Sequence, residues 1–329
     1  MTMLPPPPFP APSLAAPDLA SLAIPSFVAP TLVAPPVVVE DAAIQITGLT
    51  KRFGDLFAVQ DLTMSIPRGS VFGLIGPNGA GKSTTFAVLA TLLIPTSGEV
   101  RIAGFDPVRE PREVRKRMGY MPDTMGVYDS LRVDEYLRFF AASCEVPKAK
   151  VSKLIDELLE LVDLSTKRTA MVDSLSRGMK QRLSLARSLV HDPEVLILDE
   201  PASGLDPRAR VDLKNLIGEL RSMGKTIVIS SHILAELEEM CTDVAILEAG
   251  RLRAIGTPGA ILSGLREGRT MVVRLVGGEQ RTFVVNTDEE QAALLHRLIV
   301  EEHLSILEFS VERRNLESAF MELTEGIVQ

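Results

Sequence analysis

The sequence has no tryptophan and only two cysteines among its 329 residues. Cys144 and Cys241 each stand in an apolar helical pattern, and neither has a second thiol at the spacing of metal ligands. The cysteine content therefore disfavours a disulfide scaffold and a zinc site, and it suits a reducing compartment. Aromatic residues make up 5% of the chain, and no interfacial aromatic belt of a membrane-spanning protein is recognisable.

Basic residues are fewer than acidic ones, 35 against 43, which gives a formal net charge of −8. A protein whose main task is to bind nucleic acid neutralises phosphates with an excess of lysine and arginine. We therefore expect no nucleic-acid partner, although the overall balance leaves room for a local basic patch.

The N-terminal tail, residues 1–41, has no lysine or arginine, and Asp18 is its one charged residue before Glu40. Its prolines leave no stretch long enough for a spanning helix of about 20 residues, because each interior proline removes a hydrogen bond. A signal peptide would also need a positive N-terminal region. We expect an extended, disordered tail; the alternative is a loose contact with a membrane or a partner through Phe9, Phe27 and the valine-rich end. No later segment has transmembrane length, so the chain is not expected to span a membrane.

From residue 42 the pattern changes to alternating strands and helices. Apolar runs predict strands over residues 43–53, 62–66, 70–76, 195–198 and 226–230, and helical spacing predicts a helix over 82–93 and a helical region over about 123–190. Strands interleaved with helices indicate an α/β layered architecture. After about residue 256 the pattern predicts a small α+β appendage, with strands over 271–275, 281–285 and 306–311 and helices over 289–300 and from about 315.

A glycine-rich loop joins the apolar strand over 70–76 to the helix over 82–93. Its sequence, GPNGAGKST, fits the pattern G-x-x-x-x-G-K-[ST] of phosphate-binding loops. Glycines let backbone N–H groups point inward around phosphate oxygens, and the helix N-terminus adds partial positive charge. We expect Lys82 to reach the β- and γ-phosphates and the Ser83 hydroxyl to bind Mg2+. The predicted nucleotide-binding residues here are Gly76, Pro77, Asn78, Gly79, Ala80, Gly81, Lys82, Ser83 and Thr84.

Two adjacent carboxylates, Asp199 and Glu200, follow the apolar strand over 195–198. Ligands of open parallel sheets bind at the carboxyl ends of the strands, so these side chains should face the phosphate-binding loop. Mg2+ offsets the cost of burying Asp199, directly or through water. Glu200 is then expected to act as the general base that activates the attacking water.

With these motifs in place, residues 43–258 resemble the nucleotide-binding subunit of an ATP-binding cassette (ABC) transporter. Phe53 matches the aromatic residue that stacks on adenine in this family, and LSRGMKQR (175–182) matches the family signature. SGLD (203–206) matches the loop after the acidic motif, and His232 matches the switch histidine that contacts the γ-phosphate. The resemblance adds Ser176, Gly178 and Asp206 to the nucleotide-binding residues and implies catalytic roles for Lys82, Glu200 and His232.

The resemblance implies a P-loop NTPase domain over residues 42–258, with a helical subdomain at about 123–190, followed by an accessory domain over 259–329. It also implies ATP and Mg2+ as cofactors and a head-to-tail homodimer, in which the signature of one copy closes on the ATP held by the other. Closure would drive an integral-membrane permease subunit, which places the protein on the cytoplasmic side of the cell membrane. Physically, ATP shifts the population toward the closed dimer because it binds that state more tightly.

Three residues depart from the family's usual motifs. Asp123 stands where a glutamine usually contacts Mg2+ or water, and we expect its carboxylate to lie near the metal; the alternative is a surface aspartate that caps the following segment. Arg177 and Met179 replace a glycine and the glutamine of the signature. Arg177 either turns toward the phosphate or points away from it, and we expect the second because the phosphate pocket is already crowded.

The stretches at 126–141 and 316–326 resemble exporters of drugs, lipids or polysaccharides more than solute importers. The alternative within the family is a soluble switch that acts on ribosomes or DNA. Translation-linked members usually carry two cassettes, whereas this sequence has one phosphate-binding loop. DNA-linked members insert a long coiled coil, whereas the stretch between Lys82 and Asp199 leaves room only for a compact helical subdomain. A kinase would leave the signature unexplained, so the transporter subunit is the expected function.

Overall fold

A six-stranded sheet with the order β5-β6-β7-β3-β8-β9 forms the centre of the structure, a computed structural model that describes residues 41–123, 126, 130–231, 233–264, 269–311 and 315–324. The predicted tail lies outside the described residues except for Asp41. The strands of the sheet are β3 (Val71–Ile75), β5 (Met118–Met121), β6 (Val195–Leu198), β7 (Thr226–Ser231), β8 (Asp243–Glu248) and β9 (Arg251–Gly256). The first five strands of this order pair in parallel, and β9 pairs antiparallel to β8. The carboxyl ends of β3 and β6 therefore lie at the same end of the sheet, with β7 between the two strands.

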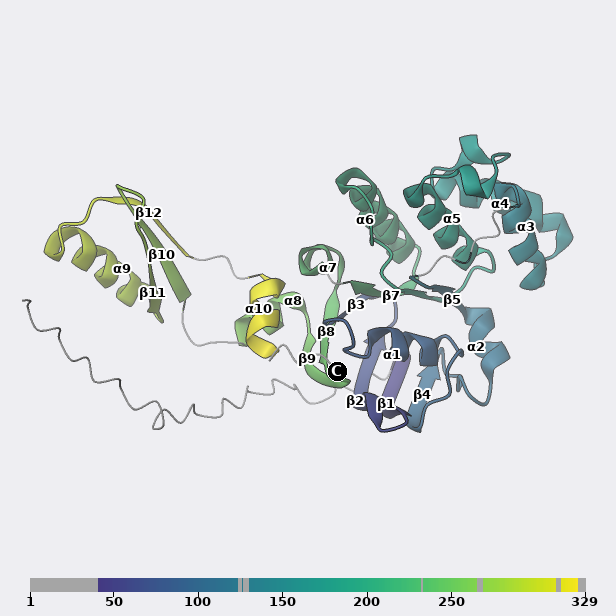
Figure 1. Cartoon of the computed structure of the whole chain (residues 1–329), viewed down its shortest axis with the longest axis horizontal. Coiled ribbons are helices and arrows are strands. Elements are labelled where there is room, and N and C mark those ends of the chain that lie inside the picture. Colours follow the sequence, from purple (N-terminus) through teal and green to yellow (C-terminus); the bar gives the residue numbers. More distant parts are fainter. Residues whose placement is uncertain are drawn as a thin grey trace, which may run out of the picture. The chain divides into compact units, whose positions relative to one another are not determined.

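Side chains of the central strands alternate between two faces, because successive residues of a strand point to opposite sides. Val71 and Ile75 of β3 belong to one apolar cluster, whereas Phe72 and Leu74 belong to another. The first cluster is completed by α3 (Val133–Ser143), α4 (Lys148–Leu161), α5 (Arg177–Leu189), α6 (Pro207–Ser222) and α7 (Leu234–Met240). The second cluster includes α1 (Lys82–Leu89), which lies between this sheet and a second, smaller one (Figure 1). The predicted α/β layering is confirmed.

The second sheet is antiparallel and has the order β2-β1-β4. Its strands are β1 (Ala42–Phe53), β2 (Leu56–Pro67) and β4 (Ser97–Ile102), and α2 (Pro111–Arg117) adds Val114 to the same apolar cluster. The tight turn between β1 and β2 follows Phe53 directly. This sheet therefore brings Phe53, far from the phosphate-binding loop in sequence, to the side of the cleft described below.

The predicted strands and helices are present, but α1 is shorter than predicted. The expected helix over residues 82–93 begins at Lys82 and ends at Leu89. Thr91 has a φ of 60°, a left-handed conformation that a continuing right-handed helix does not contain. The predicted end at residue 93 was therefore wrong. The helical region predicted over about 123–190 contains α3, α4 and α5.

The C-terminal part contains a separate small sheet. Its elements are α8 (Pro258–Gly264), β10 (Arg269–Leu275), β11 (Gln280–Val285), α9 (Asp288–His296), a π-helical turn (Arg297–Glu301), β12 (Ile306–Val311) and α10 (Leu316–Leu323). The strands pair antiparallel in the order β11-β10-β12 and share an apolar cluster with α9. By contrast, α10 packs against α7 and α8, and the Leu316 N–H donates to Glu238 Oε2 at 2.9 Å. The domain division at residues 258 and 259 stays a prediction.

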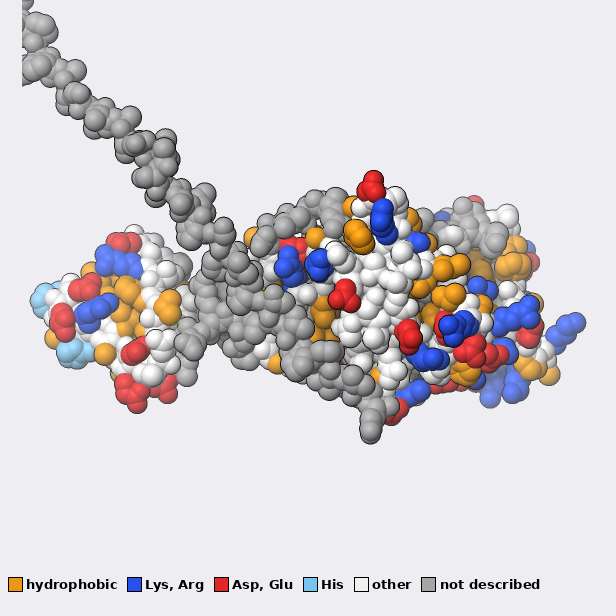
Figure 2. Space-filling model, turned by 90° about the horizontal axis from the view of Figure 1, so that it is seen from below, with side chains coloured by type: hydrophobic (Ala, Val, Ile, Leu, Met, Phe, Trp, Pro, Cys, Tyr) orange, Lys and Arg blue, Asp and Glu red, His pale blue; other side chains and the backbone are white. Residues whose placement is uncertain are grey.

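One face of the described residues carries side chains of both charges. Acidic and basic side chains are interspersed on the face shown in Figure 2. Within the portion of the chain that the structure describes, no helix combines the length and hydrophobicity needed to cross a bilayer.

Candidate functional site

The phosphate-binding loop connects β3 to α1 and packs closely against its neighbours. Gly81 has a φ of 98°, and a Cβ atom there would lie 2.5 Å from the carbonyl oxygen of Ala58 in β2. A Cβ at Gly76 would lie 2.5 Å from the carbonyl oxygen of Leu247 in β8. Only glycine fits both positions without displacing backbone. The two sheets therefore hold the loop in one shape, with α1 beginning directly behind it.

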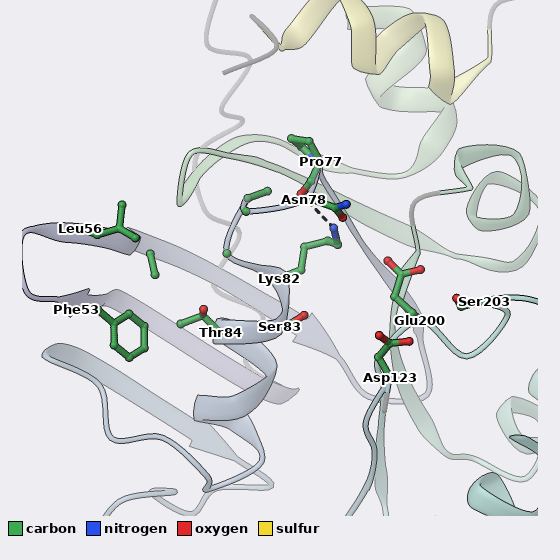
Figure 3. A pocket seen from close by; sticks show the side chains of 14 residues that line it. Phe53, Leu56, Pro77, Asn78, Lys82, Ser83, Thr84, Asp123, Glu200 and Ser203 are labelled. Carbon is green, nitrogen blue, oxygen red and sulfur yellow. Dashed lines mark hydrogen bonds between the residues drawn. The ribbon is translucent and has the colours of Figure 1, made fainter. Parts of the chain in front are cut away.

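Lys82 folds back into this loop. Its side chain is 6% exposed, and Nζ donates to the carbonyl oxygens of Gly76 at 2.7 Å and Pro77 at 3.2 Å. Burial lowers the pKa of Lys82, while the nearby carboxylates of Glu200 and Asp199 act in the opposite direction. The first residue of α1 thus holds an ammonium group where an anion bound by the loop would meet it (Figure 3).

The carboxylate of Asp199 is buried behind the loop, with 4% of the residue exposed. It accepts a hydrogen bond from the Ser230 hydroxyl, which lies 2.6 Å from Oδ1. Burial raises the pKa of Asp199, and the nearby hydroxyls of Ser230 and Ser83 lower it. A buried carboxylate beside a hydroxyl at the edge of the loop is a donor set of hard oxygens, which suits Mg2+.

Glu200 follows Asp199 and takes a different direction. Its φ is 51°, a left-handed conformation that is uncommon outside glycine. Its N–H donates to the Ser230 hydroxyl oxygen at 2.8 Å. Because of this bend, Asp199 points into the protein while the Glu200 side chain lines the cleft.

A cleft with a volume of about 710 Å³ is bordered by the phosphate-binding loop, Lys82 and Glu200. Its lining residues are Phe53, Leu56, Ala58, Pro77, Asn78, Gly79, Ala80, Gly81, Lys82, Ser83, Thr84, Asp123, Glu200 and Ser203. Phe53, 48% exposed, lies on one side of the loop, whereas Asp123 and Glu200 lie together on the other side (Figure 3). The ammonium of Lys51 lies 4.9 Å from the centroid of the Phe53 ring. The cleft therefore offers an aromatic ring, a cationic loop and two carboxylates in that order.

The signature segment forms the start of α5. Ser176 caps this helix, and its Oγ accepts from the Met179 N–H at 3.3 Å. Arg177 is exposed, and its guanidinium lies against Gly204 of the SGLD loop, where a Cβ atom would clash with it. Asp206, at the end of that loop, caps α6 by accepting from the Ala209 N–H at 2.8 Å. The two motifs are therefore in contact within one chain.

The structure gathers most of the predicted site residues but not all of them. As far as the described residues show, Gly76, Asp199, Ser176, Gly178 and Asp206 do not line the cleft. His232 lies outside the described residues. The sequence reasoning missed Leu56, Ala58 and Ser203 as lining residues. Ser203 stands in the quoted SGLD motif, but Leu56 and Ala58 carry no local signal because their position depends on how the two sheets pack.

Comparisons with known proteins agree with this geometry. A family profile described as "ABC transporter" matches residues 59–203. The Nod factor export ATP-binding protein I of Burkholderia orbicola (strain AU 1054) is 35% identical over 301 residues, which cover 86% of this chain and 97% of that protein. The probable multidrug ABC transporter ATP-binding protein YbhF of Escherichia coli (strain K12) is 38% identical over 218 residues, which cover 66% of this chain but only 38% of that protein. A solved structure of the ATP binding subunit of an ABC transporter superimposes with a TM-score of 0.63 at 32% identity, covering 68% of this chain and 92% of that one.

Proposed function

Because the chain belongs to the ABC transporter ATP-binding proteins, a family that hydrolyses ATP to power transport, we propose that the cleft is its ATP site and that Glu200 is the general base. One observation carries this proposal. The phosphate-binding loop, the buried Lys82 and the Glu200 carboxylate line a single cleft of about 710 Å³, and Asp199 is buried directly before Glu200 in the chain.

The loop and α1 bind the triphosphate. Backbone N–H groups and the N-terminus of α1 attract the negative charge. Lys82 lies among the loop carbonyls, 2.7 Å from the oxygen of Gly76, and from there its ammonium reaches the β- and γ-phosphates. At the other end of the cleft the adenine stacks on Phe53, whose ring is half-exposed.

Ser83 and Asp199 would hold Mg2+, and Asp123 lines the same cleft as Ser83. Mg2+ in phosphate sites takes one or two carboxylates and completes its shell with phosphate oxygens and water. The Ser83 hydroxyl lies near enough to the Asp199 carboxylate to lower its pKa, so the two side chains can share one cation. When bound, Mg2+ neutralises charge that develops on the phosphate oxygens.

Glu200 receives the proton of the attacking water. Its carboxylate lies on the side of the cleft opposite Phe53, near Asp123 (Figure 3), so a water between Glu200 and the terminal phosphate has an acceptor at hand. His232 is proposed from its motif alone to contact the γ-phosphate. Lys82, Glu200 and His232 together make up the proposed catalytic set.

A second copy of the chain completes the site. Ser176 is exposed and Gly178 is half-buried at the start of α5, away from the cleft of their own chain. The N-terminus of a helix is suited to a phosphate, so these residues can close on the ATP held by another copy. We assign Asp206 to the same closure, because it fixes the SGLD loop that Arg177 contacts. The active form is then a head-to-tail homodimer.

The homodimer drives a separate integral-membrane permease. The relatives are named for Nod factor export and as a probable multidrug transporter protein, and on that ground we propose export of a drug, lipid or polysaccharide. The chain would reach the inner face of the cell membrane through this permease. Nucleic acid has no part in this cycle.

Light scattering after size-exclusion chromatography tests the homodimer. The Glu200→Gln variant should bind ATP without turnover, so it should elute as a dimer with ATP and Mg2+ and as a monomer with ADP. Adding Ser176→Arg to this variant places a bulky cation at the closing surface and should keep it monomeric with ATP. A mass that is the same with ATP and with ADP would contradict the proposed closure.

A further inference from the structure

The direction of the Glu200 side chain depends on a strained main chain. Glu200 has a φ of 51°, and a left-handed conformation outside glycine persists only where the surroundings hold it. The strand β6 already ends at Leu198, so the sheet ladder does not fix Glu200. Hydrogen bonds to its N–H and its carbonyl oxygen hold it instead.

The N–H of Glu200 is held from β7. It donates to Ser230 Oγ at 2.8 Å, and the Ser230 hydroxyl donates in turn to Asp199 Oδ1 at 2.6 Å. Ser230 is fully buried. One hydroxyl thus fixes the orientation of both carboxylate residues from the side of the sheet.

The carbonyl of Glu200 is held from α5, the helix that begins with the signature. Gln181 Nε2 donates to the Glu200 carbonyl oxygen at 3.3 Å and also to the carbonyl oxygen of Pro201. The Ser203 N–H donates to the same Glu200 oxygen at 3.0 Å. Gln181 is 6% exposed, and its amide carries two hydrogens that serve two successive carbonyls.

We propose that Gln181 is a positioning residue that holds the Glu200 turn in its left-handed shape and so aims the carboxylate into the cleft. Gln181 does not line the cleft among the described residues, so it acts through Glu200 rather than on ATP. The signature residue Ser176 caps the same helix, so α5 connects the surface proposed to meet a second copy with Glu200, the proposed general base of its own chain. This inference rests on the proposed role of Glu200.

The test is the ATPase activity of a Gln181→Met variant. Methionine keeps the length and volume of the side chain and removes both hydrogen bonds. The turn at Glu200 loses its hydrogen bonds to Gln181, whereas the phosphate-binding loop is unchanged. We therefore expect kcat to fall at least tenfold while the KM for ATP stays within about twofold of wild type. Gln181→Glu should lose more, because a carboxylate placed against two carbonyl oxygens repels them.

A matched control separates positioning from damage to the fold. Leu183→Met introduces the same residue at a buried site of α5 whose side chain belongs to the apolar cluster, and it should keep kcat within about twofold. If Gln181→Met retains more than a tenth of the wild-type kcat, or loses activity only through KM, the inference is wrong. Glu200→Gln is assayed alongside. If it turns over ATP like wild type, the proposed base itself fails, whereas its loss with an active Gln181→Met overturns the positioning role alone.

Discussion

Replacing Gly81 by alanine tests the shape of the phosphate-binding loop at a single atom. The added Cβ would lie 2.5 Å from the carbonyl oxygen of Ala58 and 3.2 Å from Cγ2 of Val59. The first contact is with backbone of a paired strand, so no side-chain rotation relieves it. Gly81 also has a φ of 98°, which costs a residue with a Cβ atom about 1–2 kcal/mol.

The free-energy cost of Gly81→Ala has two parts, one from the backbone conformation and one from overpacking, and both arise at residue 81. Overpacking against a fixed neighbour adds about 1–3 kcal/mol to the backbone term. Gly81 is the residue before Lys82 and lines the cleft, so relief of the clash must move the loop away from β2. If about 1.4 kcal/mol of this cost weakens the free energy of ATP binding, the Kd for ATP rises tenfold. We expect an increase of at least that size.

Gly224→Ala serves as the control. Gly224 has a φ of 85°, and a Cβ atom there meets nothing within 4 Å. Both variants should lose stability in urea unfolding, but only Gly81→Ala should weaken binding of a fluorescent ATP analogue. Equal ATP affinity in the two variants would refute the close packing of the loop against Ala58.

Three further predictions concern single side chains. Lys82→Ala removes the ammonium at the loop, so calorimetry should show weaker ATP binding and hydrolysis should fall with it; unchanged binding would mean that phosphate lies elsewhere. Arg177→Gly removes a side chain whose guanidinium already packs against Gly204 of its own chain, so ATP turnover should stay within a few-fold; a loss of about a hundredfold, or 2.7 kcal/mol, would make Arg177 a phosphate ligand. Burial lowers the pKa of His191 below its ordinary 6.5, so its neutral form stabilises the fold fully above pH 6.5 and that stability is lost as the pH falls. In urea unfolding, the free energy of unfolding of His191→Gln should therefore decline less between about pH 7 and pH 5 than that of wild type. An identical decline would show that His191 does not contribute to the pH dependence of stability.

The sequence predicts the site best where the chemistry is local. The loop at Gly76–Thr84 depends on glycine and on the first turn of one helix, and both are visible in consecutive residues. The start of α5 at Ser176 is also local, since a serine cap and the following periodicity mark it. The helix α6 could have been found in the same way, because Asp206 caps it and Pro207 opens it.

Contacts between distant segments could not be predicted in this way. The bonds from Gln181 and Ser230 to Glu200 join three elements that meet only in the folded sheet. The packing of α10 on α7 likewise depends on where the chain returns after β12. The end of α1 was missed because Thr91 has no intrinsic preference for the left-handed conformation that it adopts.

The most direct test of the ATPase mechanism is the turnover of Glu200→Gln measured together with its ATP affinity. Glutamine keeps the shape of the side chain and removes the proton acceptor, so the loop, Lys82 and Phe53 should still bind ATP with a Kd within about threefold of wild type. Removing a general base costs about a hundredfold or more in rate, and we expect kcat to fall by at least that factor. Turnover near the wild-type rate at unchanged affinity would contradict the assignment of Glu200 as the base.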